Sequence, residues 1–110
     1  MTKFLLIQHE TAMGTWAPAD VRRHYDHHRD LDAELAAAGE LVESQGLGGR
    51  AHLVAGETGA GAPPPLAGYR VVDVESEERA LQIAARAAAA PGPDGIALRQ
   101  RVEVRRLLTP

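Results

Sequence analysis

The chain has 110 residues, of which 45% are hydrophobic, a size that supports one domain, residues 1–110, with a single modest core. Its formal net charge of −3 excludes the clustered basic excess that nucleic-acid binding requires. The absence of cysteine excludes disulfides and thiolate metal sites, and the first apolar run, four residues long, is too short for a signal segment or a membrane span. We therefore expect a cytoplasmic protein that binds neither nucleic acid nor membrane.

The first half of the chain predicts a strand, a helix and a second strand. Lys3 to Gln8 is a short apolar run of strand length. Pro18 suits the first position of a helix, which we expect to run to Ala38 because Gly39 then supplies its stop. Residues 40–46 mix apolar and polar side chains over strand length, and the glycines that follow mark the end of that strand.

The second half begins with a segment of weak pattern and then becomes regular. Residues 51–55 form a short run that we expect to pair locally, and the Gly-, Ala- and Pro-rich residues 56–68 predict a mobile loop. Tyr69 to Val74 is rich in strand-forming residues. Ser76 then predicts the N-cap of an alanine-rich helix that ends at Ala90, ahead of several prolines and glycines.

The last segment, Arg101 to Leu108, alternates well enough to be a closing strand. The order strand, helix, strand, strand, helix, strand predicts an α+β, ferredoxin-like βαββαβ domain, a four-stranded antiparallel sheet with both helices on one face. Val71 points opposite to Val72 and Val74, so apolar groups occur on both faces of that strand. We therefore expect a homodimer in which a second copy covers the open face.

The candidate site lies on the first predicted helix, because residues 22–30 hold three of the five histidines. At about 100° per residue, two of these histidines share a stripe with the leucines that anchor the helix. The stripe contains Val21, His24, His28, Leu31, Leu35 and Ala38. We therefore expect the rings of His24 and His28 to face the sheet or a cleft beside it. His27, at the edge of the stripe, and His52, in a loop, are expected to be solvated.

Two further residues complete the candidate set. Asp32 follows His28 by four residues, so its carboxylate is expected to orient the ring and favour its protonated form. His9, at the end of the first strand, must lie near the start of the helix that this strand feeds. The alternative is that His24 and His28 are half-buried packing groups. Their spacing also fits a two-histidine metal site, but no HExxH glutamate follows, and we expect neither a metal nor another cofactor.

Five segments, in this order, carry a resemblance to a known family: KFLLIQH, LDAELAAAGELVESQGL, LAGYRVVDVES, ERALQIAARAAAAPG and VEVRRLLTP. The chain resembles the YciI-like (YCII-related) family in its DGPF-domain branch, over nearly its whole length. The resemblance implies a dimeric α+β barrel that forms sheet to sheet. It also implies a histidine eleven residues before the glycine that ends the first helix, which counts back from Gly39 to His28, acting with an aspartate in a dimer cleft.

The chain departs from this family at two places. The family's aspartate comes just before a proline at the end of the second helix, where this chain reads AARAAAAP, so Asp32 is the available substitute. AGETGAGAPPP stands where the DGPF motif is expected, so that signature is missing.

Two functions follow as hypotheses. The first is a cofactor-free acid–base enzyme of isomerase, cyclase or lyase type, with His28 as general base and His24 or His9 as its partner, acting on a small organic substrate. Lyase-like activity is implied by the resemblance. The second is a non-enzymatic dimer that binds a ligand or a protein. The resemblance to the DGPF branch implies for this dimer an accessory role in transcription control linked to extracytoplasmic-function sigma factors.

Overall fold

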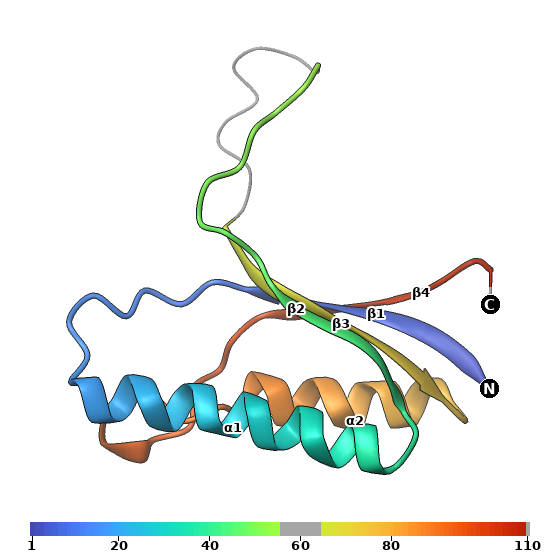
Figure 1. Ribbon diagram of the computed structural model, residues 1–110, viewed down its shortest axis with the longest axis horizontal. Coiled ribbons are helices and arrows are strands. Elements are labelled where there is room, and N and C mark those ends of the chain that lie inside the picture. The colour runs from blue at the N-terminus through green and yellow to red at the C-terminus, as the bar shows by residue number, and fades with distance from the viewer. Residues whose placement is uncertain (56–64, 110) are drawn as a thin grey trace.

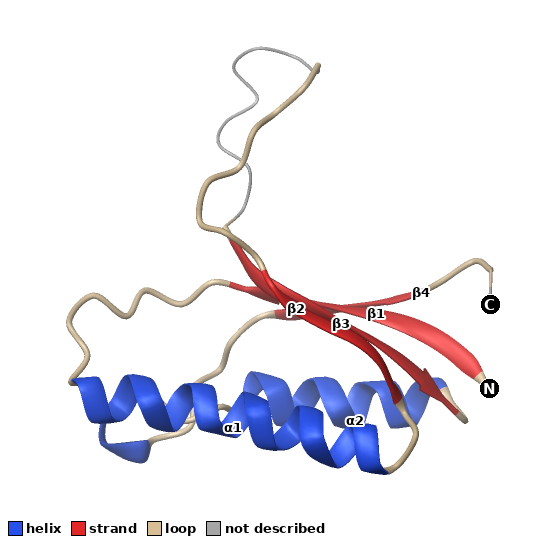
Figure 2. Ribbon diagram, viewed as in Figure 1, coloured by secondary structure: helices blue, strands red, loops and turns tan. Residues whose placement is uncertain are grey.

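The computed structural model describes residues 1–55 and 65–109, and its elements follow the predicted order (Figure 1). Four strands form one antiparallel sheet in the order β2-β3-β1-β4, and both helices cover the same face of it (Figure 2). This α+β arrangement is consistent with the predicted ferredoxin-like fold. The elements are β1 (Thr2–His9), α1 (Pro18–Ala37), β2 (Leu41–Gly46), β3 (Leu66–Val74), α2 (Glu77–Ala88), a short 3-10 turn η1 (Pro93–Gly95) and β4 (Val102–Arg106).

The helix ends follow the predicted signals closely. Pro18 occupies the first turn of α1, and Gly39 adopts a φ of 73° just past its end, a conformation that costs glycine little. Ser76 caps α2 by accepting a hydrogen bond of 3.1 Å from the backbone N–H of Arg79. α1 ends at Ala37 and α2 at Ala88, slightly before the expected ends at Ala38 and Ala90, because Ala38 and Ala89 form the C-caps.

The start of β3 differs from the sequence expectation. Residues 66–68 belong to the strand, whereas they were expected in the loop of residues 56–68, of which residues 56–64 lie outside the described part of the chain. Gly68 faces Gly46 of β2, and a Cβ on Gly68 would lie only 2.6 Å from the carbonyl oxygen of Gln45. This glycine therefore permits a close approach of two strands and does not mark a turn.

Two other expectations at strand ends are also corrected. Residues 51–55 form no strand, and they lead away from the sheet (Figure 1). The closing strand spans only Val102–Arg106, the residues that pair with Gln8 to Phe4 of β1. Single backbone hydrogen bonds from His9 to Arg101 and from Leu107 to Lys3 flank it.

The core fills the space between the sheet and the two helices. It contains Phe4, Leu6, Leu31, Leu35, Val72, Val74, Ala80, Ile83, Ala84 and Ala87. Alternate residues of β1 and β3 point to the other face, so Val71 is half-buried whereas Val72 and Val74 are fully buried. Gln8 and Arg70 are polar residues at inward strand positions, and they lie where the apolar core gives way to a cavity. No helix within residues 1–55 and 65–109 has the length and apolarity needed to span a bilayer.

Candidate functional site

A cavity of about 400 Å³ lies between the first half of α1 and the adjoining ends of β1, β2 and β3. Its volume is within the usual range for small-molecule sites. Three of the four predicted site residues line it, namely His24, His28 and Asp32, and His9 does not. The other lining residues are Gln8, Glu10, Thr11, Met13, Tyr25, Ser44, Gln45, Gly46, Leu47, Gly49, Leu66, Ala67, Gly68, Tyr69, Arg70 and Gln100.

His24 is buried, with 2% of its surface exposed, and its ring is held by a backbone carbonyl. Nδ1 lies 3.1 Å from the carbonyl oxygen of Pro91, which can only accept, so Nδ1 carries the proton and Nε2 carries the lone pair. Nε2 has no hydrogen-bond partner within residues 1–55 and 65–109, and the ring lines the cavity. The rings of Trp16 and Tyr25 pack edge-on against it, with centroids 5.6 Å away.

The protonation state of His24 follows from its surroundings. Burial lowers its pKa below the ordinary value of 6.5, the hydrogen bond to Pro91 partly opposes this, and the nearby His27 lowers it further. The ring is therefore neutral at neutral pH and presents an unprotonated nitrogen. A neutral imidazole that is oriented through its other nitrogen is the arrangement required of a general base.

Arg70 organises the inner end of the cavity, and the sequence analysis missed it. It occupies an inward position of β3, is 5% exposed, and donates from Nε to Oδ1 of Asp32 at 2.6 Å. The other oxygen of Asp32 accepts from Oγ of Ser44 at 2.8 Å, and Ser44 pairs with Arg70 across the sheet. Asp32 therefore stabilises a buried guanidinium. A charged residue at an inward position of a β-rich segment was the signal that could have revealed this site.

The guanidinium of Arg70 also contacts His28. Nη2 of Arg70 lies 3.2 Å from Nδ1 of His28 and 3.2 Å from its carbonyl oxygen. Burial and the charge of Arg70, followed by the neighbouring histidines, lower the pKa of His28 to about 3, and Asp32 raises it only as the smallest contribution. Asp32 thus favours the protonated form of His28, as expected, but burial and the charge of Arg70 outweigh it and the ring stays neutral. The carboxylate itself binds Arg70.

The direction of the hydrogen bonds around His28 follows from Arg70. A guanidinium only donates, so Nδ1 of His28 accepts and Nε2 must carry the proton. The amide of Gln8 lies 3.0 Å from Nε2, and because amide oxygen and nitrogen have the same shape, its oxygen belongs on that side. This reversal gives up the contact of Gln8 with Nη1 of Arg70, which at 3.5 Å is at the limit for a hydrogen bond.

The hydrogen-bond network continues from Gln8 to the wall of the cavity. The amide of Gln100 lies 2.8 Å from that of Gln8, and its other end lies 2.7 Å from Oγ1 of Thr11. As the structure places these amides, Gln8 donates to Oε1 of Gln100, and Gln100 donates to Oγ1 of Thr11. Reversing Gln8 so that it accepts from His28 therefore also reverses Gln100, which then accepts from the hydroxyl of Thr11. Both nitrogens of His28 are engaged in either case.

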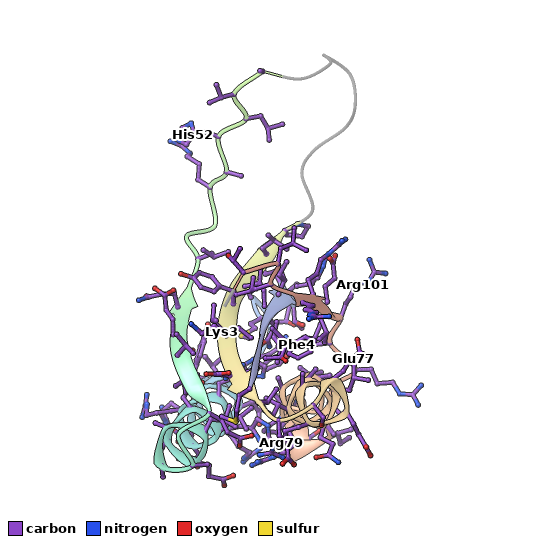
Figure 3. The ribbon with its side chains drawn as sticks, turned by 90° about the vertical axis from the view of Figure 1, so that its right-hand side faces the viewer. Lys3, Phe4, His52, Glu77, Arg79 and Arg101 are labelled. Carbon is purple, nitrogen blue, oxygen red and sulfur yellow. The ribbon has the colours of Figure 1, made fainter. Side chains whose placement is uncertain are left out.

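The remaining histidines lie elsewhere. His9 points to the open face of the sheet, where Nε2 lies 3.1 Å from Oε1 of Glu103, because strand alternation places it opposite to Gln8. The expectation that His9 shares a cavity with His24 and His28 was therefore wrong. His27 is half-buried and donates from Nε2 to the carbonyl of Arg86 at 2.8 Å, so the expectation of a solvated ring was wrong. His52 is exposed, as expected, on the segment that leads away from the sheet (Figure 3).

Within residues 1–55 and 65–109, no group of three or more His, Cys, Asp or Glu side chains has the geometry to hold a metal ion. Comparison of the chain with protein-family models and with curated proteins finds no match.

Proposed function

We propose that the chain is a small cofactor-free acid–base enzyme of isomerase, cyclase or lyase type, which acts on a small organic molecule in the cavity. The observation that carries this proposal is the state of His24. Its Nδ1 is held by the carbonyl of Pro91, its Nε2 is unbonded among the described residues, and its ring lines the cavity. An imidazole in this state accepts a proton from a bound substrate without losing the bond that orients it.

We assign the role of general base to His24. The sequence analysis had assigned it to His28. Nδ1 of His28 already accepts from Arg70, and its pKa of about 3 makes it a poor proton acceptor. His28, together with Arg70 and Asp32, is assigned as a positioning residue that fixes the inner wall of the cavity.

The reaction to test this proposal is the ring opening of 5-nitrobenzisoxazole. Removal of the proton on its ring carbon breaks the N–O bond and releases a coloured cyanonitrophenolate, so the reaction needs only a base in a cavity. His24→Asn keeps an amide N–H near the position of Nδ1, and hence the bond to Pro91, but removes Nε2. We expect this variant to lower the protein-catalysed rate by about 100-fold or more.

The matched control is His52→Asn, since His52 is exposed and does not line the cavity. This variant should keep the wild-type rate. The rate of the wild-type protein should rise with pH through a pKa below 6.5 and then level off, because only the neutral ring of His24 accepts a proton. A rate unchanged in His24→Asn would reject His24 as the base.

We also propose that a second copy of the chain covers the open face, giving the sheet-to-sheet dimer that the YciI-like resemblance implies. Leu5, Ile7 and Val71 form a partly exposed apolar centre on this face. Charged residues of both signs share this face, so one surface can pair with itself about a twofold axis. They are Lys3, Glu43, Asp73, Glu103 and Arg105. Oδ1 of Asp73, on the same face, is buried without a partner among the described residues and would gain a donor in the dimer.

Light scattering coupled to size-exclusion chromatography tests the dimer. The wild-type chain of 11.7 kDa should elute at about twice this mass, and Val71→Glu should shift it to the monomer because the new charge would be desolvated in the interface. Leu81→Glu, at an exposed apolar position of α2, is the control and should remain dimeric. A monomeric wild-type protein would reject this assembly.

The second candidate function is a non-enzymatic ligand- or protein-binding dimer. It is favoured by the charges in the cavity, because Arg70 and Asp32 satisfy each other and leave few groups for chemistry. Under this alternative a ligand would bind in the cavity, but the ring opening of 5-nitrobenzisoxazole would proceed at the same rate with the wild-type protein and with His24→Asn.

A further inference from the structure

We propose that the cavity takes an organic molecule that carries a protonated amine, and that it discriminates against carboxylates and phosphates. This inference rests on the proposed function and names the class of its substrate. It follows from which polar groups of the lining are already satisfied and which are not.

Arg70, the one arginine or lysine of the described lining, is already balanced by Asp32. Arg70 is 5% exposed, and it donates to Asp32 from Nε and to His28 from Nη2. An anionic ligand would have to displace Asp32 from a bond of 2.6 Å or share the guanidinium with it. Because both carboxylates would then be buried beside one cation, the second negative charge would be unfavourable.

A buried polar atom that remains for a ligand is an acceptor. Nε2 of His24 carries an unshared lone pair, because Nδ1 holds the proton that is donated to Pro91. An ammonium group has three N–H donors and no acceptor, so it satisfies this nitrogen, whereas a carboxylate oxygen would face its lone pair.

The charge of the lining favours the same class. Glu10 lines the cavity, is exposed, and forms no ion pair with a described residue. With Asp32 balancing Arg70, the carboxylate of Glu10 gives the described lining an excess of negative charge. Tyr25 adds an aromatic ring to the lining, and such a ring attracts a cation to its face.

Three probes of similar shape and different charge test the proposal: benzylammonium, benzyl alcohol and benzoate. Their dissociation constants are measured at about pH 7.5 by backbone amide chemical shifts of the wild-type protein. We expect benzylammonium to bind at least about fivefold more tightly than benzyl alcohol, and benzoate to bind more weakly than the alcohol. In Glu10→Gln the preference for benzylammonium should fall by about two- to fivefold, as expected for an exposed charge.

Glu78→Gln removes an exposed negative charge on α2, away from the cavity lining, and should leave the preference unchanged. The proposal is overturned if benzoate binds as tightly as benzylammonium, or if none of the three probes shifts the amides of the lining residues. These outcomes do not depend on whether His24 acts as the general base. Loss of ligand preference in a protein that still opens 5-nitrobenzisoxazole through His24 rejects the ligand class alone, whereas selective amine binding without that reaction rejects the base alone.

Discussion

Nη2 of Arg70 and Nδ1 of His28 lie 3.2 Å apart, and this contact joins β3 to α1 across 42 positions of the chain. The guanidinium supplies a permanent positive charge beside His28, which disfavours protonation of that ring. Because Asp32 balances that cation at 2.6 Å, the inner wall of the cavity is fixed without any group that must change its protonation state near neutral pH. Under the proposed function, proton transfer is then assigned to His24.

Replacing Arg70 by Met should destabilise the fold strongly. The apolar stem keeps much of the packing, but Asp32 loses the cation that compensates its partly buried charge. We expect the free energy of unfolding, measured by urea denaturation, to fall by about 2–4 kcal/mol, the lower part of the range reflecting the partial exposure of Asp32.

The double variant Arg70→Met with Asp32→Asn should recover at least about 1 kcal/mol of this loss, because no unpaired charge remains. Arg105→Met, at an exposed position of β4, is the matched control and should change the free energy of unfolding by less than about 0.5 kcal/mol. A loss of that small size for Arg70→Met would contradict a structural role for the ion pair.

Local pattern predicted the elements and the inward direction of α1. The stripe of apolar residues places His24 beside Leu31 and Leu35, and all three are buried. The order of elements followed from the same periodicity and from Ser76 and Gly39, whose local conformations do not depend on distant residues.

The partners of these residues could not be predicted in this way. Arg70 is 42 positions from His28 and 38 from Asp32, so their meeting depends on how β3 packs against α1. Helical spacing suggested a pair between His28 and Asp32, but a long-range guanidinium competes for both groups. His9 was misplaced because the side of the sheet it faces is fixed by strand register, and proximity along the chain gives no information on that.

The stability of the protein should fall as the pH is lowered below about 6.5, and His28 should account for part of this. Its pKa falls from 6.5 to about 3 on folding, so between these values the unfolded chain binds a proton that the folded chain does not. The free energy of unfolding therefore decreases as pH falls, by at most about 1.4 kcal/mol per pH unit for one proton, and is independent of this group above the unfolded pKa.

His28→Asn provides the test, because its amide oxygen replaces Nδ1 as the acceptor for Arg70 but does not titrate. Urea denaturation between about pH 5 and pH 7 avoids the range in which the carboxyls of Glu40 and Glu103, whose pKa values are lowered, lose their contribution. The variant should show a shallower dependence on pH than the wild type. Identical slopes would mean that His28 titrates normally in the folded protein.

His27→Ala should lower the free energy of unfolding by about 1 kcal/mol. The ring donates from Nε2 to the carbonyl of Arg86, one of the last carbonyls of α2, which has no partner within its own helix. Asp30→Ala, at an exposed position of the same helix, should cost less than about 0.5 kcal/mol.

The two histidines of the cavity should be opposite tautomers. The carbonyl of Pro91 requires the proton of His24 on Nδ1, and the guanidinium of Arg70 requires that of His28 on Nε2. Long-range proton–nitrogen NMR at about pH 7 distinguishes the two forms by the nitrogen shifts of each ring. On acidification, His24 should titrate below its ordinary 6.5, whereas His28 should stay neutral until the pH approaches 3. A proton on Nδ1 of His28 would contradict this assignment, because Nδ1 could then not accept from Arg70, and Gln8 would instead donate to Nε2 of His28 with its amide as the structure places it.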